Sequence, residues 1–301
     1  MIDLRSDICA APTDAMWDAM RSARLGWATY GEDESVNELE GRGAALLGKE
    51  ACVLVPTCSL ANLAALLAMT RPGDRVLVAG DDHIVVNEGD WLTEVARLEP
   101  VSMGVGEPAA VVCIENTHTR RGGTVLTAAQ TAELAARAPR SHLDGARLAN
   151  AAVALGVPLA ELAAPVDTVA VSLNKGLCAP MGTILAGDEA TIAAARVQLK
   201  RLGGATVHKA GIYAAAGLLA LDMIDRLADD HVRARRLARL IGAPEPETNI
   251  VYGDGDVDRL REAGVLAMQF DGRTRFVTHR LIDDDAIDAA AELIVSAARK
   301  Q

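Results

Sequence analysis

The chain has 301 residues, half of them hydrophobic, and carries a formal net charge of −11. This length allows one large domain and a smaller one, and the negative charge argues against nucleic acid or an anionic membrane surface as a partner. Only 3% of the residues are aromatic, so we expect a core made mostly of alanine, leucine, valine and isoleucine.

Targeting and redox signals point to a reduced cytoplasmic protein. The first residues lack the charged-then-apolar order of a signal peptide, and no apolar run reaches the roughly 18 residues that a membrane helix needs. The five cysteines are odd in number and include no Cys-x-x-Cys pair. We therefore expect free thiols and a cytoplasmic location.

Helical and strand patterns alternate along most of the chain. After an extended arm over residues 1–12, helices are predicted over 13–23, 35–47, 60–69, 127–138, 146–155, 190–202, 210–228, 230–240, 257–263 and 283–299, with a partly helical segment over 84–96. Strands are predicted over 51–56, 75–79, 109–114, 141–143, 167–174, 183–186, 249–252, 265–270 and 274–278.

The alternation of strands and helices between residues 51 and 186 predicts an α/β domain with a mainly parallel sheet. The pattern after about residue 230 predicts a smaller α+β domain. We therefore expect three parts, which are an N-terminal arm over 1–12, a large domain over 13–230 and a small domain over 231–301.

Polar residues stand at the carboxyl ends of the predicted strands, where ligands bind in open α/β sheets. They are Thr57-Cys58-Ser59, His83, His118, Asp144, Arg147 and Lys175. Taken singly, each has a structural explanation: Thr57 is an ordinary helix N-cap, either histidine is more often structural than catalytic, and Asp144 begins a turn.

Lys175 ends the apolar run 167–174 and is one of only five lysines in the chain. Burial disfavours an ammonium group, so a lysine in this place has a lowered pKa and can act as an amine nucleophile. On spacing alone, the simpler interpretation is a lysine whose head group reaches solvent at the edge of the sheet.

The polar set as a whole is more specific than its members. It combines a helix N-terminus suited to phosphate, a flat imidazole, a carboxylate, an arginine and a strand-end lysine, in this order along the chain. A pyridoxal phosphate site needs these groups, because the lysine forms a Schiff base and the carboxylate keeps the pyridine nitrogen protonated.

One motif in this set is highly specific, namely His142-Leu-Asp-Gly-Ala-Arg147 with a lysine 31 residues after its aspartate. With further segments at 3–7, 30–33, 48–51, 115–118, 122–125 and 275–279, the sequence resembles the low-specificity L-threonine aldolases of the β-eliminating lyase superfamily. These are fold type I pyridoxal phosphate enzymes. The resemblance implies an aspartate-aminotransferase-like fold, with a mainly parallel seven-stranded sheet, helices on both faces and a small C-terminal α+β domain.

The resemblance also implies roles around the cofactor. Lys175 would form the Schiff base, Asp144 would pair with the pyridinium nitrogen, and His83 would stack on the ring. Cys58 and Ser59 would hold the phosphate. No metal is expected.

For the amino-acid substrate, the resemblance implies that Arg147, Arg275 and Ser6 bind the carboxylate, with Arg147 also bordering the cofactor. Guanidinium groups suit this role because they bind carboxylates through two parallel hydrogen bonds. His118, and with it His83, would lie near the β-hydroxyl. We expect a homodimer or homotetramer with active sites at the subunit interface, where Tyr30 and the 201–209 loop are the candidates for the neighbour's contribution.

Several positions depart from the family pattern. They are Cys58 in place of glycine, Asn87 in place of an aromatic residue, Asn174 in place of serine, Cys178 in place of glycine, and His208-Lys209 in a loop that usually carries arginine and glutamine. These changes leave the cofactor residues intact but alter the surroundings of the phosphate and of the substrate's β-substituent.

Three functions follow as hypotheses. The first is a lyase that cleaves the Cα–Cβ bond of L-threonine, L-allo-threonine or a related β-hydroxy-α-amino acid to glycine and an aldehyde. The second is a related pyridoxal phosphate enzyme of a specialised amino-acid pathway, such as a β-eliminating lyase, a racemase or a transaldolase. The third is a non-catalytic binding protein on an inherited fold, against which the retained Lys175 argues.

Overall fold

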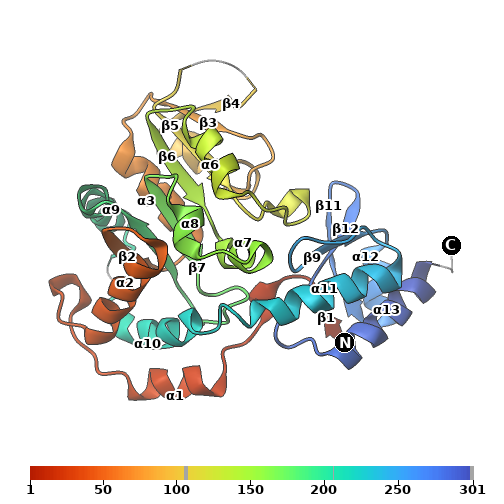
Figure 1. Ribbon diagram of the computed structural model, residues 1–301. Coiled ribbons are helices and arrows are strands. Elements are labelled where there is room, and N and C mark those ends of the chain that lie inside the picture. The colour runs from red at the N-terminus through yellow and green to blue at the C-terminus, as the bar shows by residue number, and fades with distance from the viewer. Residues whose placement is uncertain (105–107, 206, 299–301) are drawn as a thin grey trace.

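The computed structural model describes residues 1–104, 108–205 and 207–298. Its elements form a larger unit around a seven-stranded sheet and a smaller unit that contains the C-terminal strands and the first strand of the chain (Figure 1). None of the helices in these described ranges is long and apolar enough to cross a membrane.

The larger unit contains seven strands: β2 (Ala51–Val55), β3 (Arg75–Val78), β4 (Glu99–Ser102), β5 (Val111–Glu115), β6 (Arg140–Asp144), β7 (Thr168–Ser172) and β8 (Thr183–Gly187). Its α-helices are α1 (Asp14–Ser22), α2 (Glu34–Leu47), α3 (Cys58–Met69), α4 (His83–Val86), α5 (Trp91–Glu94), α6 (Ala128–Ala135), α7 (Leu148–Leu155), α8 (Leu159–Ala163), α9 (Glu189–Arg201) and α10 (Ala210–Leu221). Short 3-10 helices lie at η1 (Asp7–Cys9), η2 (Ala28–Tyr30) and η3 (Thr119–Arg121).

The strands of the large sheet follow the order β2-β8-β7-β6-β5-β3-β4. Strand β8 is antiparallel to both of its neighbours, and the other pairs are parallel. The predicted α/β class with a mainly parallel seven-stranded sheet is therefore confirmed. The carboxyl ends of β5, β6 and β7 consequently meet at one edge, which places their following residues together.

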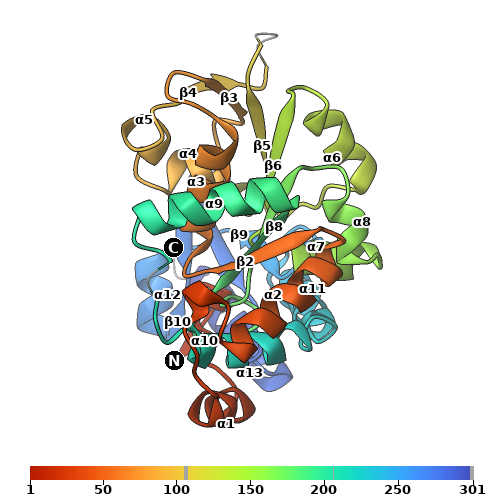
Figure 2. The same ribbon diagram turned by 90° about the vertical axis from the view of Figure 1, so that its left-hand side faces the viewer.

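Both faces of the sheet are covered by helices (Figure 2). Along β7, Val169 and Val171 join the core beneath α2, α7, α8 and α10, whereas Ala170 joins the core beneath α3 and α9. Successive strand residues point to opposite faces, so a strand buried on both faces is mostly apolar rather than alternating. This is the physical reason for the mostly apolar run that precedes Lys175.

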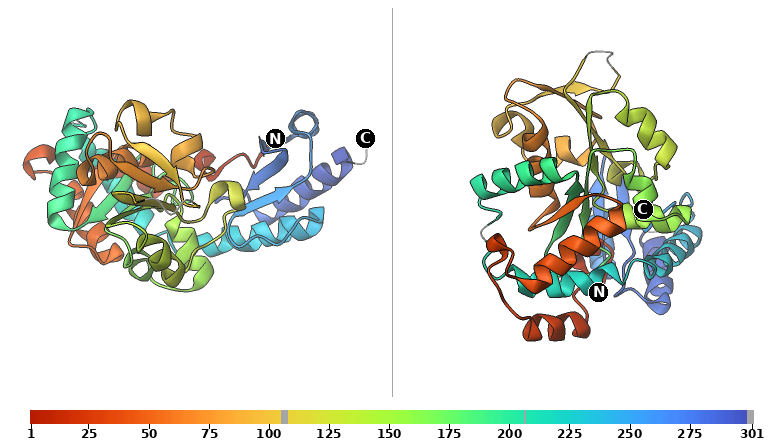
Figure 3. Two further views of the ribbon diagram at one scale, coloured as in Figure 1. Left: turned by 90° about the horizontal axis from the view of Figure 1, so that it is seen from above. Right: turned by 60° about the vertical axis from the view of Figure 1, so that its left-hand side comes forward.

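The smaller unit contains β1 (Ile2–Asp3), α11 (Leu227–Ile241), β9 (Ile250–Gly253), α12 (Val257–Ala263), β10 (Val265–Leu266), β11 (Met268–Phe270), β12 (Arg273–Val277) and α13 (Asp284–Ala298). It has its own antiparallel sheet, in the order β11-β12-β9, and a short parallel pair between β1 and β10. Figure 3 shows this unit to one side of the large one, with α11 and α13 running alongside each other. The division at residues 230 and 231 stays a prediction, and α11 runs across it.

The N-terminal arm links the two units. Leu4 is fully buried in the small unit's core, and its backbone bonds to Leu266 and Val277. The chain then turns toward the large unit, where Asp7 is buried. The extended arm predicted for residues 1–12 therefore carries a strand and a 3-10 turn that position residues near the strand ends.

Three local features differ from the predicted elements. The helix predicted over 210–228 ends at Leu221, and a turn over 222–226 separates it from α11. Strand β4 and helix α8 were not predicted. Residue 206 of the predicted 201–209 loop and residue 299, the predicted end of the last helix, lie outside the described residues.

Candidate active site

Lys175 lies just beyond β7, in a turn closed by a backbone hydrogen bond of 2.8 Å from Cys178 to Lys175. Its Nζ has no hydrogen-bond or ion-pair partner among the described residues. Burial, followed by the positive charge of Arg147, lowers the pKa of the Lys175 amine. The structure therefore places a half-buried lysine, whose amine is more easily deprotonated than that of a surface lysine, at the carboxyl edge of the sheet.

Asp144 is the last residue of β6 and is 3% exposed. One carboxylate oxygen accepts a 2.9 Å hydrogen bond from Asn62, and the other accepts one of 3.1 Å from the Ala146 amide. Asn62 is in turn 2.9 Å from His142, which is buried in the same motif. These contacts fix the orientation of a carboxylate that β6 positions.

Helix α3 begins at Cys58, and its N-cap Thr57 accepts a 3.1 Å hydrogen bond from Leu60. The first amides of a helix have no partner within it and favour anions. The Cys58 thiol lies 3.7 Å from the Asp144 carboxylate, and burial together with that charge raises its pKa well above the ordinary value. The thiol thus stays protonated, while the amides of Cys58 and Ser59 remain at the helix end.

His83 opens the short helix α4 and lies beside Asp144. The nearest ligand atoms of His83, Glu88 and Asp144 all lie within 4.8 Å of one another. His83 Nδ1 is 3.1 Å from Glu88, and the second oxygen of Glu88 accepts a 2.6 Å hydrogen bond from Trp91. The sequence analysis did not single out Glu88. Its place five residues after His83 is a local signal that could have indicated a partner for the imidazole.

His118 lies after β5, and its side chain is 6% exposed. Its Nε2 is 3.1 Å from Asp82 and 3.7 Å from Glu115. Burial alone would lower the pKa of His118, but the hydrogen bond to Asp82 and the charge of Glu115 outweigh it, so the pKa is raised. His118 therefore sits in a carboxylate-rich pocket that favours its protonated form.

Arg147 makes a two-pronged ion pair with Asp7, at 2.9 and 2.6 Å, and both side chains are buried. Its remaining nitrogen donates to the Thr119 hydroxyl at 3.3 Å. The charge of Arg147 holds the pKa of Asp7 well below its usual range despite burial. The sequence reasoning assigned Arg147 to the substrate carboxylate and missed Asp7, which already binds two of its nitrogens.

Arg275 comes from β12 of the small unit and is 5% exposed. It stacks on Phe270, with 4.4 Å between the guanidinium carbon and the ring centre, and donates to the Arg5 carbonyl at 3.0 Å. Burial and the charge of Arg147 lower the pKa of Arg275 to about 10, so it stays cationic at neutral pH. Ser6 is 7% exposed and its hydroxyl lies 3.3 Å from Asp7.

Tyr30 lies apart from this group. Its side chain is 69% exposed, and it packs edge-on against Trp27, with ring centres 4.8 Å apart. His208 also packs edge-on against Trp27, at 6.1 Å. The two segments expected to serve a neighbouring subunit are therefore side by side on the surface of one chain.

Three further positions depart from the family pattern. Cys178 is fully buried and adopts a left-handed backbone, with φ of 64°. Such a conformation favours glycine, which explains why glycine is usual there. Asn174 is half-buried beside Lys175, and Asn87 is exposed at the end of α4.

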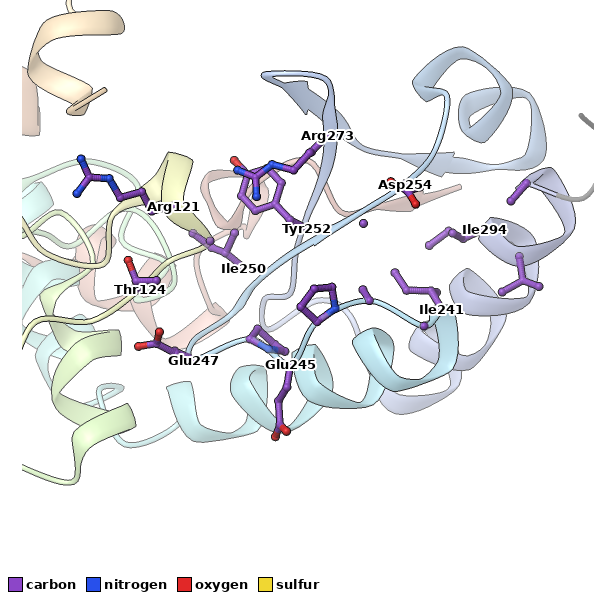
Figure 4. Close-up of a pocket in the computed structure, with 18 residues that line it drawn as sticks. Arg121, Thr124, Ile241, Glu245, Glu247, Ile250, Tyr252, Asp254, Arg273 and Ile294 are labelled. Atoms are coloured by element: carbon purple, nitrogen blue, oxygen red, sulfur yellow. The ribbon is translucent and has the colours of Figure 1, made fainter. Parts of the chain in front are cut away.

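A separate cavity of about 720 Å³ lies between the 121–124 turn and the small unit. Figure 4 shows Arg273 over the ring of Tyr252, with Arg121 and Thr124 on one side and Ile241 and Ile294 on the other. None of the expected site residues lines this cavity.

The chain is similar to known proteins along most of its length. A family model described as beta-eliminating lyase matches residues 3–108 and 97–263. Low-specificity L-threonine aldolase 1 of Arabidopsis thaliana is 31% identical over 329 residues, covering 93% of this chain and 92% of that protein. Alanine racemase TOXG of Cochliobolus carbonum is 30% identical over 342 residues, covering 97% of this chain and 86% of that protein.

Among solved structures, the threonine aldolase of Leishmania major superimposes with a TM-score of 0.81 at 16% identity, covering 100% of this chain and 99% of that one. This structural similarity concerns the fold alone. The assignment to a family rests on the family model and on the sequence relatives. The chain belongs to the β-eliminating lyase family, and it is a pyridoxal phosphate-dependent lyase related to the low-specificity L-threonine aldolases.

Proposed function

We propose that this enzyme cleaves the Cα–Cβ bond of L-threonine, L-allo-threonine or a related β-hydroxy-α-amino acid, releasing glycine and an aldehyde. The observation that carries the proposal is the convergence of one half-buried lysine, two histidines, Asp144 and two buried arginines at the carboxyl edge of the sheet. The relatives named as threonine aldolases support the same reaction.

The residues at this edge fit pyridoxal phosphate. The Nζ of Lys175, which has no partner in the part of the chain that the structure describes, would bind the cofactor's aldehyde carbon, and Asp144 would hold a proton on its ring nitrogen. The amides of Cys58 and Ser59 and the Ser59 hydroxyl would bind the phosphate at the start of α3. When bound, pyridoxal phosphate supplies an electron-withdrawing ring that stabilises negative charge at the substrate's Cα.

His83 would lie flat against the ring. Its position supports this role, because the imidazole is within 4.8 Å of the Asp144 carboxylate group and is oriented by Glu88. Glu88 is itself held by Trp91, so the orientation of the imidazole does not depend on the ligand.

Arg275, Arg147 and Ser6 would bind the substrate carboxylate. We expect Arg275 to contribute more than Arg147 to binding this carboxylate, because two nitrogens of Arg147 already bind Asp7. The carboxylate would thereby be held between a side chain of the small unit and one of the large unit. His118, or a water that it orients, would take the β-hydroxyl proton.

The experiment incubates the enzyme with L-threonine and with L-allo-threonine, and couples acetaldehyde formation to NADH oxidation by alcohol dehydrogenase. We expect NADH loss in step with glycine formation. Larger β-hydroxy amino acids are tested through the aldehydes they release. Absence of aldehyde from every member of such a panel would rule out the proposed reaction.

A racemase or β-eliminating lyase is the alternative. It is favoured by the 30% identity to a protein named alanine racemase and by the unusual Asn87, Asn174 and His208. Exchange of the Cα hydrogen in deuterated water without aldehyde would identify racemase-type chemistry, and pyruvate formation from serine would identify β-elimination.

The proposed assembly is a homo-oligomer that acts on a small amino acid, with the Tyr30 turn and the 201–209 loop reaching toward a neighbouring subunit. The exposed Trp27 and Tyr30 rings support it, since large exposed aromatics next to one another are typical of subunit interfaces.

A further inference from the structure

Three carboxylates surround one ring nitrogen of His118. Its Nε2 lies 3.1 Å from Asp82, 3.7 Å from Glu115 and 3.8 Å from Asp81. Asp82 is anchored in turn, because its other oxygen accepts a 2.7 Å hydrogen bond from the Ala79 amide. A carboxylate anchored in this way has one oxygen left to aim at the imidazole.

The second ring nitrogen of His118, Nδ1, is buried and has no hydrogen-bond partner among the described residues. The main chain holds the residue in place, since the His118 amide donates to Thr124 at 3.1 Å and its carbonyl accepts from Gly123 at 2.9 Å. A carboxylate can only accept hydrogen bonds, so Nε2 carries the hydrogen and the neutral ring has its lone pair on Nδ1.

We propose that Asp82 is the positioning residue of His118, which it holds as the Nε2–H tautomer so that Nδ1 is the atom that receives the substrate's β-hydroxyl proton. This inference rests on the proposed aldehyde-releasing function. The O–H electron pair becomes part of the aldehyde carbonyl, the Cα–Cβ bond breaks, and its electron pair stays with the glycine fragment. The proton remains on Nδ1, and Asp82 stabilises the resulting imidazolium charge.

Charged groups from several elements face this imidazole. Asp81 and Asp82 come from the loop before α4, Glu115 from the end of β5, and Arg121 from η3, where it binds Asp81 at 2.8 Å. Burial, together with the charge of Asp144, raises the pKa of Glu115. From the small unit, Tyr252 and Arg273 donate to the carbonyls of Thr119 and Arg120.

The raised pKa of His118 agrees with this assembly, because burial opposes protonation and the carboxylates overcome it. The base is active only when neutral. The aldehyde-releasing rate should therefore fall as the pH drops through this raised pKa, and weakening the carboxylate field should move the fall to lower pH.

The first test measures His118 itself, by NMR of the imidazole nitrogens in the holoenzyme over a pH series, with assignment from a His118→Gln variant. We expect the Nε2–H tautomer in the native enzyme, and in Asp82→Asn both a lower His118 pKa and a shift away from that tautomer. Asp271→Asn, which removes an exposed carboxylate paired with Arg120 in the same region, is the control and should change neither. An unchanged pKa and tautomer in Asp82→Asn would overturn the proposal, whatever the activity.

The second test measures the pH dependence of kcat for aldehyde release. In Asp82→Asn we expect kcat to fall about 10²-fold, the lower end of a general base's contribution, with little change in KM and with the acid limb moved to lower pH. Asp82→Glu should restore part of the rate. A loss of rate without movement of the acid limb would overturn the positioning role. A native enzyme that releases no aldehyde would instead overturn the proposed function. In that case the NMR measurement alone would decide whether Asp82 positions His118.

Discussion

At the scale of single residues, the buried pair of Asp7 and Arg147 should be costly to break. Two charge-assisted hydrogen bonds join side chains that are 0% and 6% exposed. Removing one partner leaves an unpaired buried charge, so we expect Asp7→Asn to lower the free energy of unfolding by about 3–5 kcal/mol. Asp3→Asn, which breaks a half-exposed pair with Arg5 in the same arm, should cost less than about 1 kcal/mol.

The free energy of unfolding of both variants is measured by urea denaturation, followed by circular dichroism at fixed protein and cofactor concentrations. The pKa of Asp7 is lower in the folded protein than in the unfolded one. The contribution of the pair is therefore complete above the unfolded pKa and is lost as the pH falls toward the folded one. Equal costs for the two variants, or an Asp7→Asn variant with the native acid sensitivity, would contradict this account.

The site residues that could be predicted from sequence are those inside the motif 142–147 and at the ends of apolar runs. Asp144 ends β6 and Lys175 follows β7 by three residues, so the sheet geometry places both at its carboxyl edge. Asp7, Asp82 and Glu88 were missed. Asp7 meets Arg147 across 140 residues of chain, and Asp82 meets His118 across 36. Such pairings leave no local pattern, because they depend on how the sheet brings distant loops together.

At the scale of elements, the start of α3 combines a stability role with the proposed phosphate site. Thr57 caps α3, and Thr127 caps α6 through a capping box away from the site. We expect Thr57→Ala and Thr127→Ala each to cost about 1 kcal/mol of stability. Only Thr57→Ala should also weaken pyridoxal phosphate binding, because it loosens the amides of Cys58 and Ser59.

Fluorescence titration of the apoenzyme with pyridoxal phosphate separates the two effects. The expected result is a several-fold weaker affinity for Thr57→Ala and a native affinity for Thr127→Ala. Equal affinities in the two variants would exclude α3 from the phosphate site.

Elements were predictable where burial imposes a pattern. Strands β5 and β7 are mostly apolar because helices cover both faces of the sheet. Strand β4 was missed because it is an edge strand, largely exposed and containing Pro100, and its sequence carries no such pattern. The turn over 222–226 was missed because it contains neither glycine nor proline, so helical periodicity continues across it.

At the scale of the whole molecule, the exposed aromatic group formed by Trp27, Tyr30 and His208 supports an interface between subunits. We expect light scattering after size-exclusion chromatography to give at least twice the chain mass of 31.5 kDa. Trp27→Asp should shift the enzyme toward monomer and lower its activity. Leu240→Asp, at a 48% exposed position on α11, should change neither. A native monomer with full activity would contradict the shared-site proposal.

The central claim is that Lys175 binds pyridoxal phosphate, and it has a direct test. The holoenzyme should show a visible absorbance band that borohydride removes, and the reduced protein is then digested and analysed by mass spectrometry. We predict a single pyridoxyl adduct, on the peptide that contains Lys175, and no band in Lys175→Ala. An adduct on Lys49, Lys200, Lys209 or Lys300, or no adduct at all, would contradict the claim.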